Sequence, residues 1–280
     1  MDTAGKTIAE SGGAKGSDDE WAQAAHRQGH HIWHHVVDGT KGRWFATRML
    51  SIKHTDEAEL RKAEKYMKDS VGGPNGLAKA WPRAEFSKKL LTRNYFQVES
   101  TSSLYAVGNF LPSGKARGKA KASFMNVQVE GGTGWTVQAF AMMAKDDLWT
   151  MARLDVAGPV DTIKAEHTVE GRLRIESMET GHNRVRVYLS MYFFNQSPIE
   201  PERQGWWQGT LESPQGGLRE IGFFHFRWRR LTDSNGLPPP PKSGTRYTAV
   251  GTRELLPIGR SAIHQVMEKC QIDPIPVTSS

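Results

Sequence analysis

Residues 183–194 read NRVRVYLSMYFF, and apolar side chains alternate along this stretch with arginine and tyrosine. Successive side chains of a β-strand point to opposite faces, so the alternation predicts a strand with one buried and one exposed face. The buried face would hold Val185, Val187, Leu189, Met191 and Phe193. The exposed face would hold Arg184, Arg186, Tyr188, Tyr192 and Phe194.

Two other stretches repeat the pattern. In residues 169–176, Arg172 and Arg174 alternate with apolar side chains, and Arg227 and Arg229 do so in a strand expected over 219–231. A short turn at 180–182 would join the first two strands and place Arg174 opposite Tyr188. The polar faces of these strands would then lie on one side of an antiparallel sheet.

Short runs of β-branched and aromatic residues, separated by Gly, Pro, Asn and Ser, continue along most of the chain beyond residue 94. They predict a long series of antiparallel strands with no helix between them, so the fold class we expect is mainly β, an antiparallel sandwich or barrel. The expected strands are 94–99, 103–110, 121–130, 135–144, 147–156, 167–177, 183–194, 205–212, 219–231 and 246–252.

The rest of the chain divides by composition. Asp56 followed by Glu59 predicts a capped helix that ends at the glycines before Pro74, and Pro82 opens a second helix. Ile263, Val266, Met267 and Cys270 predict one face of a short C-terminal helix. The domains we expect are a disordered arm (1–19), a helical segment (20–93), an antiparallel β domain (94–232), a Pro-rich linker (233–245) and a terminal strand and helix (246–280).

Composition excludes several classes of protein. The 280 residues contain one cysteine, which rules out a disulfide scaffold, and no apolar run is long enough to span a membrane. The start of the chain lacks the apolar segment of a signal peptide, so we expect a cytoplasmic protein. Its net charge of +7 favours acidic partners such as nucleic acid.

Four cations stand within seven residues of a stretch that has no carboxylate: Lys115, Arg117, Lys119 and Lys121. Alanine and glycine separate them, so the backbone can approach phosphates closely. The arginine and tyrosine face described above could add base stacking and charge pairing, as sheet surfaces that bind single strands do. Two simpler interpretations stay open: the basic run is a solvated loop, and the sheet face is covered by a helix or exposed only for solubility.

Five of the ten histidines lie within ten residues: His26, His30, His31, His34 and His35. On a helix, residues four apart share a face, and such a histidine pair can chelate a divalent metal. The cluster therefore predicts a metal site. A surface tract that gains charge below about pH 6.5 is the alternative.

These features favour a non-catalytic protein that binds nucleic acid, RNA included, or another polyanion, within a homo-oligomer or a larger assembly. The binding residues we expect are the four cations of the basic run together with Arg172, Arg174, Arg184, Arg186, Tyr188, Arg227 and Arg229. No cofactor other than a divalent metal is indicated. The alternative is a β-barrel carrier or enzyme for a small ligand, with an interior lined by Trp and Phe. Signatures of an enzyme are weak, since no Walker loop, nucleophile elbow or dinucleotide fingerprint is present.

Overall fold

Nine strands form one mixed sheet in the computed structural model, in the order β3-β2-β1-β9-β4-β6-β7-β8, with β5 also paired to β6. The structure describes residues 5–13, 15–37, 49–112, 123–154, 172–175, 186–212, 224–232 and 236–270. No helix in these ranges is long and apolar enough to cross a membrane.

Six strands form the parallel part of the sheet: β1 (Ile8–Ser11), β2 (His31–Val37), β3 (Met49–His54), β4 (Ser103–Gly108), β6 (Arg186–Asn195) and β9 (Arg246–Gly251). Although β9 comes late in the chain, it lies between β1 and β4. An early and a late segment of the chain therefore pair with each other near the centre of the sheet.

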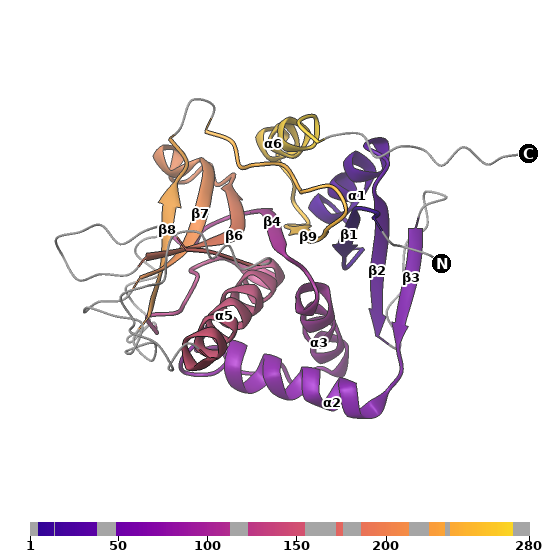
Figure 1. The fold of residues 1–280 in the computed structure, drawn as a ribbon, viewed down its shortest axis with the longest axis vertical. Coiled ribbons are helices and arrows are strands. Elements are labelled where there is room, and N and C mark those ends of the chain that lie inside the picture. The colour runs from indigo at the N-terminus through magenta and orange to yellow at the C-terminus, as the bar shows by residue number, and fades with distance from the viewer. Residues whose placement is uncertain are drawn as a thin grey trace, which may run out of the picture.

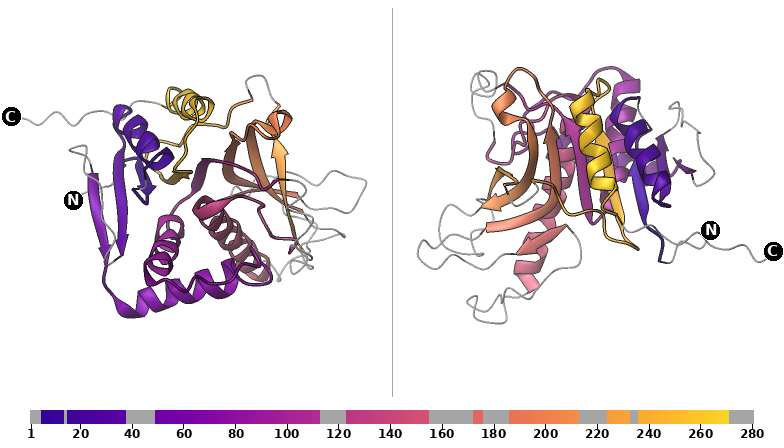
Figure 2. Two further views of the ribbon diagram at one scale, coloured as in Figure 1. Left: turned by 180° about the vertical axis from the view of Figure 1, so that it is seen from behind. Right: turned by 90° about the horizontal axis from the view of Figure 1, so that it is seen from above.

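Helices cover both faces of this parallel part. One face carries α1 (Ser17–Arg27) and α6 (Pro257–Met267), which lie side by side in the right view of Figure 2. The other carries α3 (Glu85–Glu99) and α5 (Gly131–Leu154), and α2 (Glu57–Tyr66), which continues into the π-helical turn η1 (Met67–Val71), packs against these two helices; Figure 1 shows α2 below α3 and α5. Strand parity explains the arrangement, since Leu104 and Ala106 face α3 and α5 whereas Tyr105 and Val107 face α1 and α6.

The antiparallel part comprises β5 (Leu173–Ile175), β7 (Gly205–Glu212) and β8 (His225–Arg230), together with β6. Here the sequence prediction is confirmed: Arg174 pairs with Tyr188, and Val187, Leu189 and Phe193 are completely buried. The alternation of the two faces continues across the register shift between Tyr188 and Tyr192, because Met191 and Phe193 lie in the same core as Val187 and Leu189, but helices cover the opposite face beyond it. Tyr192 and Phe194, expected on the exposed face, are instead buried with the residues beneath α6.

The expected antiparallel sandwich or barrel is wrong, because the sheet is open, mixed and covered by helices. Residues 135–144 and 147–154, expected in two strands, lie in the single helix α5, and the remainder of the second expected strand lies outside the described residues. The buried α5 residues Val137, Phe140, Ala141, Ala144 and Leu148 follow helical spacing. The helix is apolar on most sides, and this obscured its period.

The N-terminal predictions also need correction. Residues 8–11, expected in a disordered arm, form β1, and residues 31–37 and 49–54, expected to be helical, form β2 and β3. Residues 94–99, expected as a strand, end α3. The capped helix at Asp56 is confirmed, since its carboxylate accepts hydrogen bonds from the N–H groups of Ala58 and Glu59. The C-terminal helix is confirmed as α6, with Ile263, Val266 and Met267 buried.

The segment expected as a linker, 233–245, leads into the central strand β9 rather than to a separate unit. Of its described residues, Leu237 packs against the core beneath α6, and the carbonyl of Pro239 accepts a hydrogen bond from the Tyr105 hydroxyl at 2.9 Å. The terminal strand that it introduces pairs with β1 on one side and β4 on the other.

Candidate functional site

The parallel strands β1, β4 and β9 end at the same edge of the sheet, which we call the carboxyl edge. From β1 the chain passes through α1 to β2 and β3, whereas β4 and β6 lie on the other side of β1. Strand order therefore reverses near β1 and β9. In open α/β sheets, ligands bind outside the carboxyl ends of the strands at such a reversal.

The loop that follows β1 is rich in glycine because neighbouring groups approach its backbone closely. A Cβ atom on Gly12 would lie 2.4 Å from a guanidinium nitrogen of Arg93. One on Gly16 would lie 2.4 Å from the carbonyl oxygen of Arg253, in the segment after β9. Gly16 also has a φ of 90°, which glycine adopts readily. The loop thus packs against α3 on one side and the end of β9 on the other.

Two buried polar side chains, His34 and Gln97, face this loop with nitrogen atoms that are not fully hydrogen-bonded. His34 is 2% exposed, and a Cβ on Gly13 would lie 2.9 Å from its Nδ1. Neither ring nitrogen has a described partner in good hydrogen-bonding geometry, although the Ser11 backbone lies close enough to raise the pKa of the ring. Gln97 is 1% exposed, and its unpaired Nε2 would lie 2.9 Å from a Cβ on Gly12. Buried polar groups are normally satisfied, so this region has hydrogen-bonding capacity left for a ligand.

The charges at the carboxyl edge are unevenly distributed. Burial lowers the pKa of Arg93, which lies near the charges of Asp18 and Arg253. The Asp18 carboxylate accepts a hydrogen bond from the Gly251 N–H at 3.0 Å and so joins the start of α1 to the end of β9. Asp18, Asp19 and Glu20 fill the first turn of α1, so this helix terminus does not favour an anion.

The start of α5 is different. No acidic residue occupies its first turn, and a Cβ on Gly132 would meet no atom within 4 Å. Thr133 lies 3.8 Å from the position of a Cβ on Gly108, the last residue of β4, so this helix terminus adjoins the carboxyl edge. Unpaired N–H groups and the helix dipole favour an anion there.

Sequence reasoning missed this edge. The glycines of 12–16 fall in the expected disordered arm, and those of 131–134 fall in the turn between two expected strands, although the first run leads into α1 and the second begins α5. If β1 is recognised as a strand, the glycine-rich loop between β1 and α1 indicates a strand–loop–helix unit of the kind that binds ligands.

The histidine cluster does not form the predicted metal site. Because residues 31–37 form a strand, His34 and His35 point to opposite faces, so the expected helical stripes are wrong. His26 lies on α1, His30 Nδ1 is 2.9 Å from the Tyr247 hydroxyl, and His31 begins β2. Within the described ranges, no group of three or more His, Cys, Asp or Glu side chains could hold a metal ion.

The antiparallel part carries a second candidate surface, the Arg–Tyr surface, formed by Arg186, Tyr188, Arg227 and Arg229; the backbone of Arg174 pairs opposite Tyr188 at its margin. Tyr188 lies opposite Thr210, which lies opposite Arg227. Arg229 donates to the Tyr188 hydroxyl at 2.5 Å, and its guanidinium lies 5.8 Å from the ring centroid. Strand pairing therefore brings these residues together as expected.

Not every predicted cation belongs to this surface. Arg172 turns toward the helices, where it donates to Asp147 at 2.7 Å and to the Val98 carbonyl at 2.9 Å. It precedes β5, so strand alternation does not fix its direction. Arg186 pairs with Glu212 at 2.8 Å. Arg184 and the basic run of Lys115, Arg117, Lys119 and Lys121 lie outside the described residues.

Comparison of the chain with protein-family models, curated proteins and solved structures finds no match. The class of molecule is therefore defined by its own architecture: an open, mixed α/β sheet with a polar carboxyl edge and a separate cationic surface.

Proposed function

We propose that the protein binds a small phosphorylated ligand at the carboxyl edge. The observation that carries this proposal is the placement of the buried, incompletely hydrogen-bonded side chains of His34 and Gln97 beside the glycine loop at the reversal of strand order. The phosphate would bind at the start of α5, whose first turn, unlike that of α1, has no carboxylate; Glu130 comes directly before it.

The extent of the edge sets the size of the ligand. β9 separates β1 from β4, so their ends lie about 10 Å apart, twice the spacing of adjacent strands. A lone phosphate cannot contact both the start of α5 and His34 beyond β1. A nucleotide-sized molecule can, with its phosphate at α5 and its polar groups near His34 and Gln97. The alternative function expected from the sequence is a small-ligand carrier or enzyme, with the ligand inside a β-barrel. Here the small ligand would bind at the edge of an open sheet instead.

Substitution of Gly132 tests this directly. Gly132→Glu places a carboxylate at the start of α5, where there is open space, so it should leave the fold intact and weaken ADP binding at least about tenfold by charge repulsion. Gly132→Gln has nearly the same size without the charge and should bind nearly as the parent does. Isothermal titration calorimetry with ADP measures the affinity of the parent and of both variants. Equal affinity in the Glu and Gln variants, or no ADP binding by the parent, would contradict the proposal.

We propose as a second function that the Arg–Tyr surface binds single-stranded nucleic acid or another polyanion. Arg227 and Arg229 are exposed and, within the described ranges, form no ion pair with a carboxylate. They flank Tyr188, whose ring can stack on a base. The basic run would extend this surface by supplying phosphate contacts.

Salt dependence separates the two parts of this surface. Replacing Arg227 and Arg229 with Gln should reduce the slope of log affinity against log salt by up to about 1.4, at ~0.7 for each phosphate contact on a single strand. Tyr188→Ala should weaken binding by about 1–3 kcal/mol with little change of slope, because a neutral ring releases no counterions. Fluorescence anisotropy with labelled oligo(dT) measures both effects.

The matched control is Arg61→Gln, since Arg61 is an exposed arginine on α2, away from the antiparallel strands. It should change neither quantity. If the double Gln variant keeps the parent's slope, the Arg–Tyr surface does not contact phosphate. A four-Gln variant of Lys115, Arg117, Lys119 and Lys121 should flatten the slope by up to about 3 if the basic run takes part.

A further inference from the structure

A buried carboxylate and two histidines form a hydrogen-bonded chain across β1, β2 and β3. Glu10 Oε2 lies 2.5 Å from His35 Nε2, and His35 Nδ1 lies 2.8 Å from His54 Nε2. Glu10 is completely buried and His35 is 3% exposed, whereas His54 is half-buried and ends β3. The chain therefore runs from the interior of the sheet to its carboxyl edge.

Arg246 fixes the inner end of this chain. Its Nε donates to Glu10 Oε1 at 2.6 Å, a second guanidinium nitrogen contacts the same oxygen, and the guanidinium lies 4.5 Å from the centroid of the Trp33 ring. The carboxylate is thus an acceptor on both oxygens. The histidine that faces it must donate.

With both rings neutral, these contacts assign the nitrogens that carry protons. His35 donates from Nε2 to Glu10, so its neutral ring can only accept at Nδ1. His54 Nε2 must then be the donor to His35, which leaves the lone pair of His54 on Nδ1. A carboxylate behind an imidazole orients the ring and stabilises the cation that forms when it takes up a proton.

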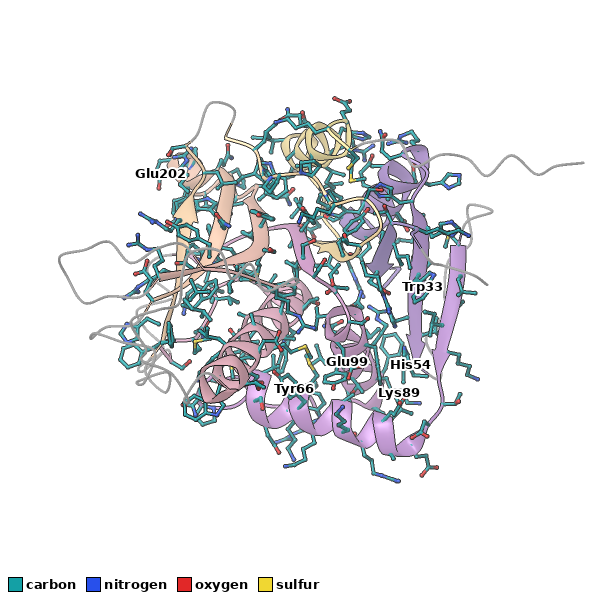
Figure 3. All side chains as sticks on the ribbon, viewed as in Figure 1. Trp33, His54, Tyr66, Lys89, Glu99 and Glu202 are labelled. Carbon is teal, nitrogen blue, oxygen red and sulfur yellow. The ribbon has the colours of Figure 1, made fainter. Side chains whose placement is uncertain are left out.

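The outer end lies against α3, the helix that also carries Gln97. The His54 ring stacks on Phe96 of α3 with centroids 3.7 Å apart, and the next residue, Gln97, faces the glycine loop. Burial lowers the pKa of His54, and His35 on β2 lowers it further, whereas the Glu99 carboxylate on α3 raises it. Figure 3 shows His54 in the same part of the view as Trp33, Lys89 and Glu99.

We infer that His54 is the base of a proton-transfer site, positioned by Glu10 and His35, that activates a water molecule or a hydroxyl group of the ligand at the carboxyl edge. The O–H proton passes to His54 Nδ1, and the Nε2 proton of His54 passes to His35 Nδ1. The positive charge then lies on His35 beside the Glu10 carboxylate, so no oxidant, reductant or second substrate is required. This inference takes its substrate from the proposed function and adds acid–base chemistry to binding.

The test is made on the ligand-free full chain with ¹⁵N-labelled histidine. At pH 7, long-range ¹H–¹⁵N spectra should show His54 protonated on Nε2 alone, together with a strongly downfield Nε2 proton on His35. Glu10→Gln should shift that proton upfield and give His54 a mixture of both tautomers. His264→Gln removes another histidine–carboxylate contact, with Glu20, and should leave both signals unchanged. A His54 protonated on Nδ1 in the parent would overturn the inference.

Chemical reactivity gives a second readout. Diethyl pyrocarbonate should modify His54, and Glu10→Gln should slow this reaction about tenfold, as expected when a histidine loses its supporting carboxylate. An unchanged rate would contradict the role of Glu10. ADP titration separates the two proposals. If ADP does not bind but the histidine tautomers are as expected, only the ligand site is contradicted. If ADP binds but the tautomers differ from those expected, only the proton-transfer site is contradicted.

Discussion

Leu189→Ala should lower the free energy of unfolding by about 2–5 kcal/mol, as expected for a large apolar side chain removed from a close-packed core. Leu189 is completely buried in β6, beneath the helices α3 and α5. Arg186, on the opposite face, is about one-third exposed and paired with Glu212, so Arg186→Ala should cost no more than about 1 kcal/mol. Urea unfolding monitored by circular dichroism compares the two variants. Equal losses would mean that the two faces of β6 are assigned wrongly.

The protein should lose stability as the pH falls from 6.5 toward 4, in part because of His34. Burial, followed by the nearby Arg93 and His35, lowers the pKa of His34 to about 4 from its ordinary value of 6.5, although the Ser11 backbone opposes the shift. The unfolded chain therefore binds a proton first. His34 contributes stability that is present above pH 6.5 and is lost as the pH falls toward the folded pKa, by about 2 kcal/mol between pH 7 and pH 5.

Comparison with His34→Gln isolates this effect from other titrating groups. The urea midpoints of the parent and the variant should respond differently to pH, with the parent falling more steeply between pH 7 and pH 5. His54, whose pKa is also lowered to about 4 by burial and by His35, remains in both proteins and contributes the same slope to each. Parallel pH profiles would show that His34 is accessible to protons in the folded state.

Local alternation predicted the antiparallel part of the sheet correctly because the information lies in neighbouring residues. Arg174 and Tyr188 belong to strands close in sequence, and their pairing follows from a short connection. The parallel part depends on contacts between distant segments. β1 has four residues, one of them the buried Glu10, and it becomes a strand because β9, more than 230 residues later, pairs with it.

The two candidate sites also differ in how far the local sequence predicts them. The Arg–Tyr surface could be predicted, since strand parity places Tyr188, Arg227 and Arg229 on one face. The carboxyl edge could not, because Gly12, Arg93 and Arg253 come together only when three separate segments meet. The histidine cluster failed for a related reason: five histidines close in sequence are divided between a helix, a loop and both faces of a strand.

A crystal structure of the protein with ADP tests the central claim most directly. We expect the phosphates within hydrogen-bonding distance of the backbone N–H groups of Gly132 and Thr133, and the rest of the ligand in contact with His34 or Gln97. ADP bound elsewhere, on the Arg–Tyr surface for example, or a structure from saturating ADP with no ligand at the carboxyl edge, would contradict the account.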